Sequence, residues 1–213
     1  MYIPPIEDVL LDLVLVRHGQ SYGNVPLNGE RWPEKLPLSE RPHDIETHRV
    51  PNDWHLTPLG LQQADYLGRF YADLPLDQVI CSHMQRAQST AQAVVKYQPK
   101  PVELRIEPEV CEVFDCGSSD PEQWQARTLR VVRALRGDSP PGARVMMVSH
   151  GVFNNFLLNA LLGLPSPPHT VRFFQHNTGV SRVIFCNENV PDYERVQLQY
   201  MNRVDHLPQE CIT

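Results

Sequence analysis

Three short segments of the sequence carry side chains that could together handle a phosphoryl group. Arg17 and His18 follow one apolar run, Arg86 follows a second, and His150 follows a third. A guanidinium presents a planar fork of donors that matches phosphate oxygens, and a neutral imidazole can attack phosphorus to form a covalent intermediate. Two arginines and two histidines therefore predict phosphoryl chemistry, provided that the fold brings the three segments together.

Each of these residues taken alone has a simpler explanation, as a turn residue or as a solvated residue at the start of a helix. The functional interpretation depends on all of them standing at the same kind of junction. Three neighbours could add donors to the same anion, because Ser21 and Asn24 follow His18 closely and Gly151 would lie at a helix N-terminus. We therefore expect Ser21, Asn24 and Gly151 to bind substrate.

These junctions belong to a regular alternation of strands and helices. Apolar runs and β-forming residues predict strands over residues 11–16, 78–81, 102–106, 144–149, 178–185 and 193–200. Helical periodicity predicts helices over residues 57–72, 85–97, 120–137 and 151–163. The last two strands could form a hairpin.

This alternation predicts an α/β fold with three layers, in which helices cover both faces of a mostly parallel central sheet. The carboxyl ends of parallel strands meet at one edge of the sheet, where ligands bind. The three reactive segments should therefore converge in one cleft, although they are far apart in the sequence. A length of 213 residues fits one domain that spans residues 1–213.

The helix boundaries have local signals. Thr57 and Asp120 each precede a proline, and a capping side chain before a proline is typical of a helix start. Gly137 and Gly163 are expected to end the third and fourth helices.

Residues 26–55 interrupt the pattern with five prolines and no clear period. We expect a long irregular loop that acts as a lid or specificity element, because it directly follows Asn24. A solvated surface loop is the alternative. Its candidates for contact with a leaving group are Arg31, Trp32, Arg41, Arg49 and Trp54.

Composition excludes several other classes of function. The net charge of -6 argues against nucleic acid as a partner. The acidic N-terminus is unlike a signal peptide and no apolar run reaches about 18 residues, so we expect a cytoplasmic protein without a membrane partner. The five cysteines are irregularly spaced, and we expect reduced thiols rather than a Cys111–Cys116 disulfide. The pattern does not decide the oligomeric state.

A metal site is disfavoured. No HxxxH or HExxH pair occurs, and the arginines near His18 and His150 would repel a cation. We expect neither a metal nor another cofactor.

Four segments, in order, resemble motifs of the histidine phosphatase superfamily, which includes the phosphoglycerate mutases. They are LVLVRHGQSYGN at 13–24, LTPLGLQQA at 56–64, SHMQRAQSTA at 82–91 and VSHG at 148–151. The resemblance implies that His18 is the nucleophile, that Arg17, Arg86 and His150 bind the phosphoryl oxygens, and that Asn24 contacts the phosphate.

The resemblance also implies a glutamate that acts as general acid and base after the third strand. Glu112 fits this position best, and Glu109 is the alternative. Three residues depart from the family pattern: Gln20 replaces a common glutamate, Gly23 replaces a bulky residue that is often tryptophan, and His83 replaces a proline. The segment that follows Glu112 is also one residue longer than usual.

Only 37 residues separate Glu112 from His150, whereas mutases that resemble this chain usually carry a long insertion there. This favours a phosphatase that hydrolyses a small phosphomonoester through a phosphohistidine on His18. A phosphoglycerate-type mutase and a catalytically silent module that binds phosphorylated ligands are the alternatives. The sequence does not identify the substrate.

Overall fold

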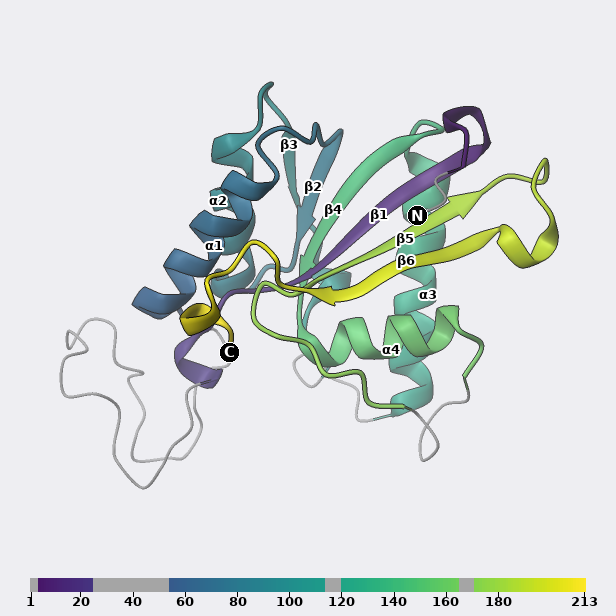
Figure 1. Ribbon diagram of the computed structural model, residues 1–213. Helices are drawn as coiled ribbons and strands as arrows, with labels where there is room; N and C mark the ends of the chain where they lie inside the picture. The colour runs from purple at the N-terminus through teal and green to yellow at the C-terminus, as the bar shows by residue number, and fades with distance from the viewer. Residues whose placement is uncertain (1–3, 25–53, 114–119, 165–170) are drawn as a thin grey trace.

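The computed structural model describes residues 4–24, 54–113, 120–164 and 171–213 (Figure 1). Within these ranges a six-stranded sheet has the order β3-β2-β4-β1-β5-β6. The strands are β1 (Val9–Arg17), β2 (Gln78–Cys81), β3 (Glu103–Ile106), β4 (Ala143–Ser149), β5 (Val180–Cys186) and β6 (Val196–Arg203). Strands β3, β2, β4 and β1 run parallel, and the β5–β6 hairpin adds antiparallel strands beside β1. The predicted mostly parallel α/β fold is confirmed.

Four α-helices accompany the described strands, namely α1 (Pro58–Phe70), α2 (Gln85–Tyr97), α3 (Pro121–Asp138) and α4 (Gly151–Leu161). Thr57 and Asp120 cap α1 and α3 as predicted, since their side chains accept hydrogen bonds from main-chain N–H groups of the first turn. Gly163, which follows α4, has a positive φ of 66°.

The predicted end of α3 is wrong by a residue, because the helix continues through Gly137 to Asp138. Ser139 is extended, and it precedes Pro140. A residue before proline is disfavoured in the helical conformation, so the proline and not the glycine ends α3.

Strand β1 is buried on both faces, which gives the three layers (Figure 1). Leu11, Leu13 and Leu15 pack into one core cluster with residues of α3 and α4. Val14 and Val16 pack into a second cluster with residues of α1 and α2. This double burial explains why β1 reads as a continuous apolar run rather than as an alternating one.

The register of the parallel strands brings the three reactive segments together. Val148 of β4 pairs with Val16 of β1 on one side and with Cys81 of β2 on the other. The three strands therefore end at the same level of the sheet. His18, His150 and the start of α2 leave this edge side by side.

Two glycines let α1 approach the loop that carries His18. A Cβ atom at Gly60 would lie 1.9 Å from the main-chain oxygen of Gln20, and one at Gly19 would lie 2.6 Å from that of Gly60. The Thr57 N–H group donates to the same Gln20 oxygen at 2.9 Å. The glycine in LTPLGLQQA is thus required by backbone packing.

The cysteine prediction is wrong at one position. Cys81, Cys186 and Cys211 are free, as expected, but Cys111 is disulfide-bonded. Sequence spacing alone does not show whether two thiols meet in space. Cys116 lies outside the described residues, as does the expected loop over 26–55 apart from Trp54 and His55.

None of the helices in the described ranges has the length and apolar character needed to cross a membrane.

The glycine packing predicts opposite effects of two alanine substitutions. Gly60→Ala should lower the melting temperature and the activity, because its methyl group would force α1 away from the His18 loop. Gly137→Ala should raise the free energy of unfolding by about 0.5–1 kcal/mol, since this helical glycine has open space around it. Thermal and urea unfolding measure both changes. Equal effects of the two substitutions would contradict this interpretation.

Candidate active site

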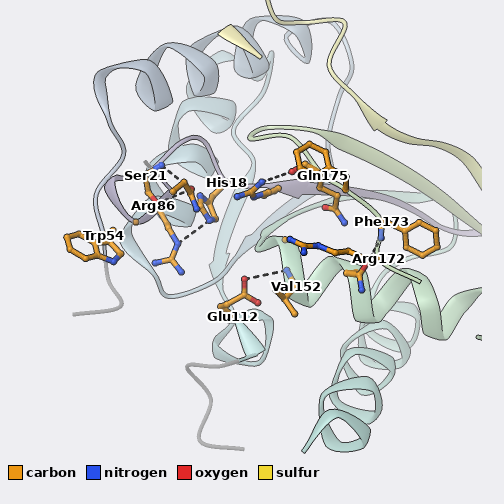
Figure 2. A pocket seen from close by; sticks show the side chains of 15 residues that line it. His18, Ser21, Trp54, Arg86, Glu112, Val152, Arg172, Phe173 and Gln175 are labelled. Atoms are coloured by element: carbon orange, nitrogen blue, oxygen red, sulfur yellow. Dashed lines mark hydrogen bonds between the residues drawn. The ribbon is translucent and has the colours of Figure 1, made fainter. Parts of the chain in front are cut away.

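A pocket of about 640 Å³ opens at the carboxyl edge of the parallel strands (Figure 2). Seven of the eight residues that the sequence singles out line it: Arg17, His18, Ser21, Asn24, Arg86, Glu112 and Gly151. The eighth, His150, is fully buried and touches His18 and Arg86 behind the pocket wall. The remaining lining residues are Gly23, Trp54, Val152, Asn155, Arg172, Phe173, Phe174 and Gln175.

His18 is held in the tautomer that a nucleophile needs. Its Nδ1 atom lies 2.7 Å from the main-chain oxygen of Gly19, and only an N–H group can satisfy that contact. Its Nε2 atom therefore carries the lone pair, which accepts a hydrogen bond from Arg86 Nε at 3.1 Å. Burial, with the nearby charges of Arg86 and Arg17, holds the pKa of His18 well below its ordinary value. The ring is thus neutral at physiological pH.

His150 has the opposite tautomer. Its Nδ1 atom lies 3.2 Å from Arg86 Nη2, and because a guanidinium can only donate, Nδ1 must accept. Burial is the largest cause that lowers the pKa of His150, so the ring is neutral and its Nε2 carries the hydrogen. This buried Nε2–H group has no partner among the described residues. An orphaned donor of this kind is costly and is expected where a ligand completes the site.

Arg17 supplies a second guanidinium. Its Nη1 donates to the main-chain oxygen of Gln175 at 2.5 Å, and its buried Nε has no partner among the described residues. Burial lowers its pKa, and the nearby Glu112 opposes that effect. Gly151 packs against it, since a Cβ atom there would lie 3.4 Å from Arg17 Nε.

Glu112 is the carboxyl group that faces this cluster (Figure 2). Its Oε1 accepts from the N–H groups of Val113 at 2.9 Å and Phe153 at 3.1 Å, so the carboxyl also binds the first turn of α4. Burial raises the pKa of Glu112 despite these hydrogen bonds. Glu109, in contrast, is exposed, pairs with Arg130 at 3.3 Å and does not line the pocket. The geometry favours Glu112 over Glu109 as the acid.

Asn24 has a defined amide orientation. Its Oδ1 accepts from Ser21 N at 3.2 Å, Ser21 Oγ at 3.1 Å and Asn177 Nδ2 at 3.3 Å. Three donors around one atom identify it as the oxygen, so Nδ2 is the end that remains for an anion. The Ser21 hydroxyl group donates its hydrogen to Asn24 Oδ1. In this arrangement Ser21 orients the Asn24 amide. Its contact with substrate stays a prediction.

Trp54 occupies the space that a side chain at position 23 would need. A Cβ atom at Gly23 would lie 2.5 Å from Trp54 Cδ1. The family pattern has a bulky side chain where this chain has Gly23. Here the indole of Trp54 occupies the corresponding space, and it comes from another segment of the chain. Of the five loop residues named as candidate leaving-group contacts, Trp54 lines the pocket, and the other four lie outside the described residues.

Sequence reasoning missed Asn177 and the pocket wall formed by Arg172, Phe173, Phe174 and Gln175. Asn177 Nδ2 donates to the main-chain oxygen of His18 at 3.0 Å and so connects the segment before β5 to the loop that carries His18. No motif marks these residues, and their place in the pocket follows from the path of the chain between α4 and β5.

Among the described residues, no group of three or more His, Cys, Asp and Glu side chains could hold a metal ion.

The family model of the histidine phosphatase superfamily (branch 1) matches residues 13–117 and 109–198. This chain belongs to the histidine phosphatase superfamily. The matched ranges contain all eight candidate residues, including the motifs around His18 and His150.

Relatives within the superfamily have two kinds of name. Over 205 residues the chain is 24% identical to a Yersinia pestis protein named "Probable phosphoglycerate mutase GpmB", with 82% of this chain and 85% of that protein covered. A mutant phosphoserine phosphatase from Entamoeba histolytica, in complex with phosphoserine, has a TM-score of 0.66 at 20% identity and covers 93% of this chain and 100% of its own. The mycobacterial glucosyl-3-phosphoglycerate phosphatase bound to VO3 has a TM-score of 0.62 at 21% identity, with coverages of 91% and 99%. The structural likenesses show the fold, and both kinds of name describe phosphoryl-transfer enzymes.

The buried histidines predict how stability depends on pH. Burial holds the pKa of His18 and His150 well below the ordinary value and lowers that of His206 to about 4. As the pH falls below about 6.5, the unfolded chain takes up protons that these folded rings do not, so the free energy of unfolding decreases. Each ring contributes a slope of at most about 1.4 kcal/mol per pH unit.

Urea unfolding between about pH 7.5 and about pH 5 measures this slope. His206→Gln should make it shallower, because glutamine does not titrate. A free energy of unfolding that stays constant over this range would contradict the proposed origin of the slope.

Proposed function

We propose that this chain is a phosphatase that hydrolyses a phosphomonoester through a phosphohistidine on His18. The observation that carries the proposal is the lone pair on His18 Nε2, held beside two guanidiniums in a pocket that also contains a carboxyl group. A nucleophile, groups that bind an anion and a proton donor are the three parts that this reaction needs.

In the first step, His18 Nε2 attacks phosphorus and the bond to the ester oxygen breaks. Glu112 gives its proton to the leaving oxygen, which departs as an alcohol. In the second step, Glu112 takes a proton from water, whose oxygen attacks the phosphohistidine, and inorganic phosphate leaves with His18 restored. A pKa raised by burial suits Glu112 to both steps, because it holds a proton more readily than an ordinary glutamate does.

The phosphoryl oxygens would be bound by donors that have no partner in the free structure or that are bonded to His18. Arg86 Nε must release the His18 lone pair, and it can then turn to an oxygen without leaving the site. His150 Nε2–H and Arg17 Nε are two buried donors at this site that have no partner among the described residues. Preorganised donors around the developing charge stabilise the transition state without further rearrangement.

Phosphate release from a panel of phosphomonoesters, measured with a chelator present, tests the proposal. The activity should survive chelation, vanish in His18→Ala and be inhibited by vanadate, which mimics five-coordinate phosphorus. Mass spectrometry of briefly mixed wild-type enzyme should find an acid-labile phosphate on the peptide that contains His18. Turnover that persists in His18→Ala would sink the mechanism.

Glu112 and Glu109 form a matched pair for the proton-transfer role. Glu112→Gln keeps an oxygen that can accept from Phe153 N but cannot transfer a proton, so kcat should fall by about 10²–10⁴-fold. The melting temperature should stay the same or rise, because a buried ionisable group is removed. Glu109→Gln should leave kcat unchanged.

The pH profile gives the same assignment independently. Activity of the wild type should fall as the pH rises through the pKa of Glu112, and Glu112→Gln should lack this basic limb. A basic limb that remains in Glu112→Gln would assign the acid to another group.

A phosphoglycerate-type mutase is the second candidate, favoured by the name of the Yersinia pestis relative. The short connection between Glu112 and His150 supports the phosphatase instead. Product analysis separates them, because a mutase returns an isomeric phosphate ester and little inorganic phosphate. A silent binding module would bind phosphate esters without either outcome.

A further inference from the structure

The part of the pocket beyond the phosphate cluster is walled by the segment Val171–Gln175, which has no regular secondary structure. Its main chain is held by two asparagines on one face of α4. Asn159 donates to Val171 O at 2.7 Å and accepts from Val171 N at 2.9 Å, while Asn155 accepts from Phe173 N at 2.7 Å. These bonds fix the main chain on both sides of Arg172.

The far end of the segment is tied to the phosphate cluster itself. Arg17 Nη1 donates to Gln175 O, and Asn154 Nδ2 donates to Gln175 Oε1 at 3.1 Å. The wall is therefore built at a set distance from the nucleophile, with α4 as the common support.

Arg172 projects from this wall into the pocket (Figure 2). Among the described residues its guanidinium has no hydrogen bond or ion pair. It is not the partner of Glu112, whose carboxyl oxygens accept from Val152 N and Phe153 N at the start of α4. Burial raises the pKa of Glu112, and the charge of Arg86 lowers it in part. Trp54 and Phe173 lie at opposite sides of the pocket (Figure 2), so its lining is apolar as well as charged.

The charges in the pocket indicate what this third guanidinium is for. Arg17 and Arg86 already match the two charges of a phosphoryl dianion. Glu112, which must be protonated for the first step, contributes no charge at that stage. The positive charge of Arg172, on the leaving-group side, then has no matching negative charge on the phosphoryl group. The pocket volume of about 640 Å³ also exceeds what a phosphate needs.

We propose that Arg172 recognises an anionic group on the leaving group of the substrate, and that Asn155 and Asn159 position it. This inference rests on the proposed phosphatase function. A carboxylate and a second phosphate both suit the planar donor fork of a guanidinium, so the shared chemistry is an anion near the ester.

Calorimetric binding to the His18→Ala variant tests the proposal without requiring turnover. The probes are two matched pairs. The first is 3-phosphoglycerate with glycerol 3-phosphate, in which a hydroxymethyl group replaces the carboxylate, and the second is fructose 1,6-bisphosphate with fructose 6-phosphate, which lacks the second phosphate. In at least one pair, the member with the second anionic group should bind about tenfold more tightly, which is the value of one well-formed charged contact. The pair that shows the preference identifies the anion.

Adding Arg172→Gln should reduce this preference to about one. Adding Arg133→Gln, which removes an exposed arginine of α3 outside the pocket, should leave it intact. Adding Asn155→Ala should lower the ratio of affinities within the pair, whereas a merely structural defect would weaken both probes equally.

Equal affinity for the members of both pairs in the His18→Ala parent would overturn the proposal. So would a preference that survives Arg172→Gln. Failure of the phosphatase function is seen separately, as absence of phosphate release by the wild-type enzyme, and it leaves the ratio of affinities readable.

Discussion

In the proposed mechanism His18 attacks phosphorus, which requires a lone pair on its Nε2 atom, and the contacts around His18 keep that lone pair available. The Gly19 carbonyl holds the hydrogen on Nδ1, and burial beside two guanidiniums keeps the ring uncharged. In the proposed function the same guanidiniums bind the phosphoryl anion. If the proposal holds, one arrangement keeps His18 uncharged before the reaction and also attracts the anionic substrate.

The scaffold meets this requirement through backbone geometry more than through side chains. Parallel strands that end in register place His18 beside His150, and the absence of a Cβ at Gly60 lets α1 pack closely against the loop that carries His18. Helix α4 links both ends of the pocket. Its first turn binds Glu112, and its asparagines hold the wall that carries Arg172.

The sequence predicted most of the fold and of the phosphate cluster, because each prediction depended on a local signal. The apolar run of β1 and the Thr57 cap are both found where expected. The prediction that α3 ends at Gly137 was wrong because a glycine can lie within a helix. Ser139, which precedes Pro140, was the stronger signal for the end of the helix. The prediction of a reduced thiol at Cys111 was wrong because the pairing of thiols depends on their distance in space and not on their spacing in the sequence.

The sequence alone determined that Arg17, His18, Arg86 and His150 meet at one edge of the sheet, since each of them follows a parallel strand in a fold of this class. Only the tertiary structure decided how the side chains around them are placed. Glu112 rather than Glu109 enters the pocket, and Ser21 donates a hydrogen bond to Asn24. Trp54 fills the space of a side chain at position 23. The reason is physical. These roles depend on hydrogen bonds and contacts between segments that are brought together by packing, and no local pattern records which segments will meet.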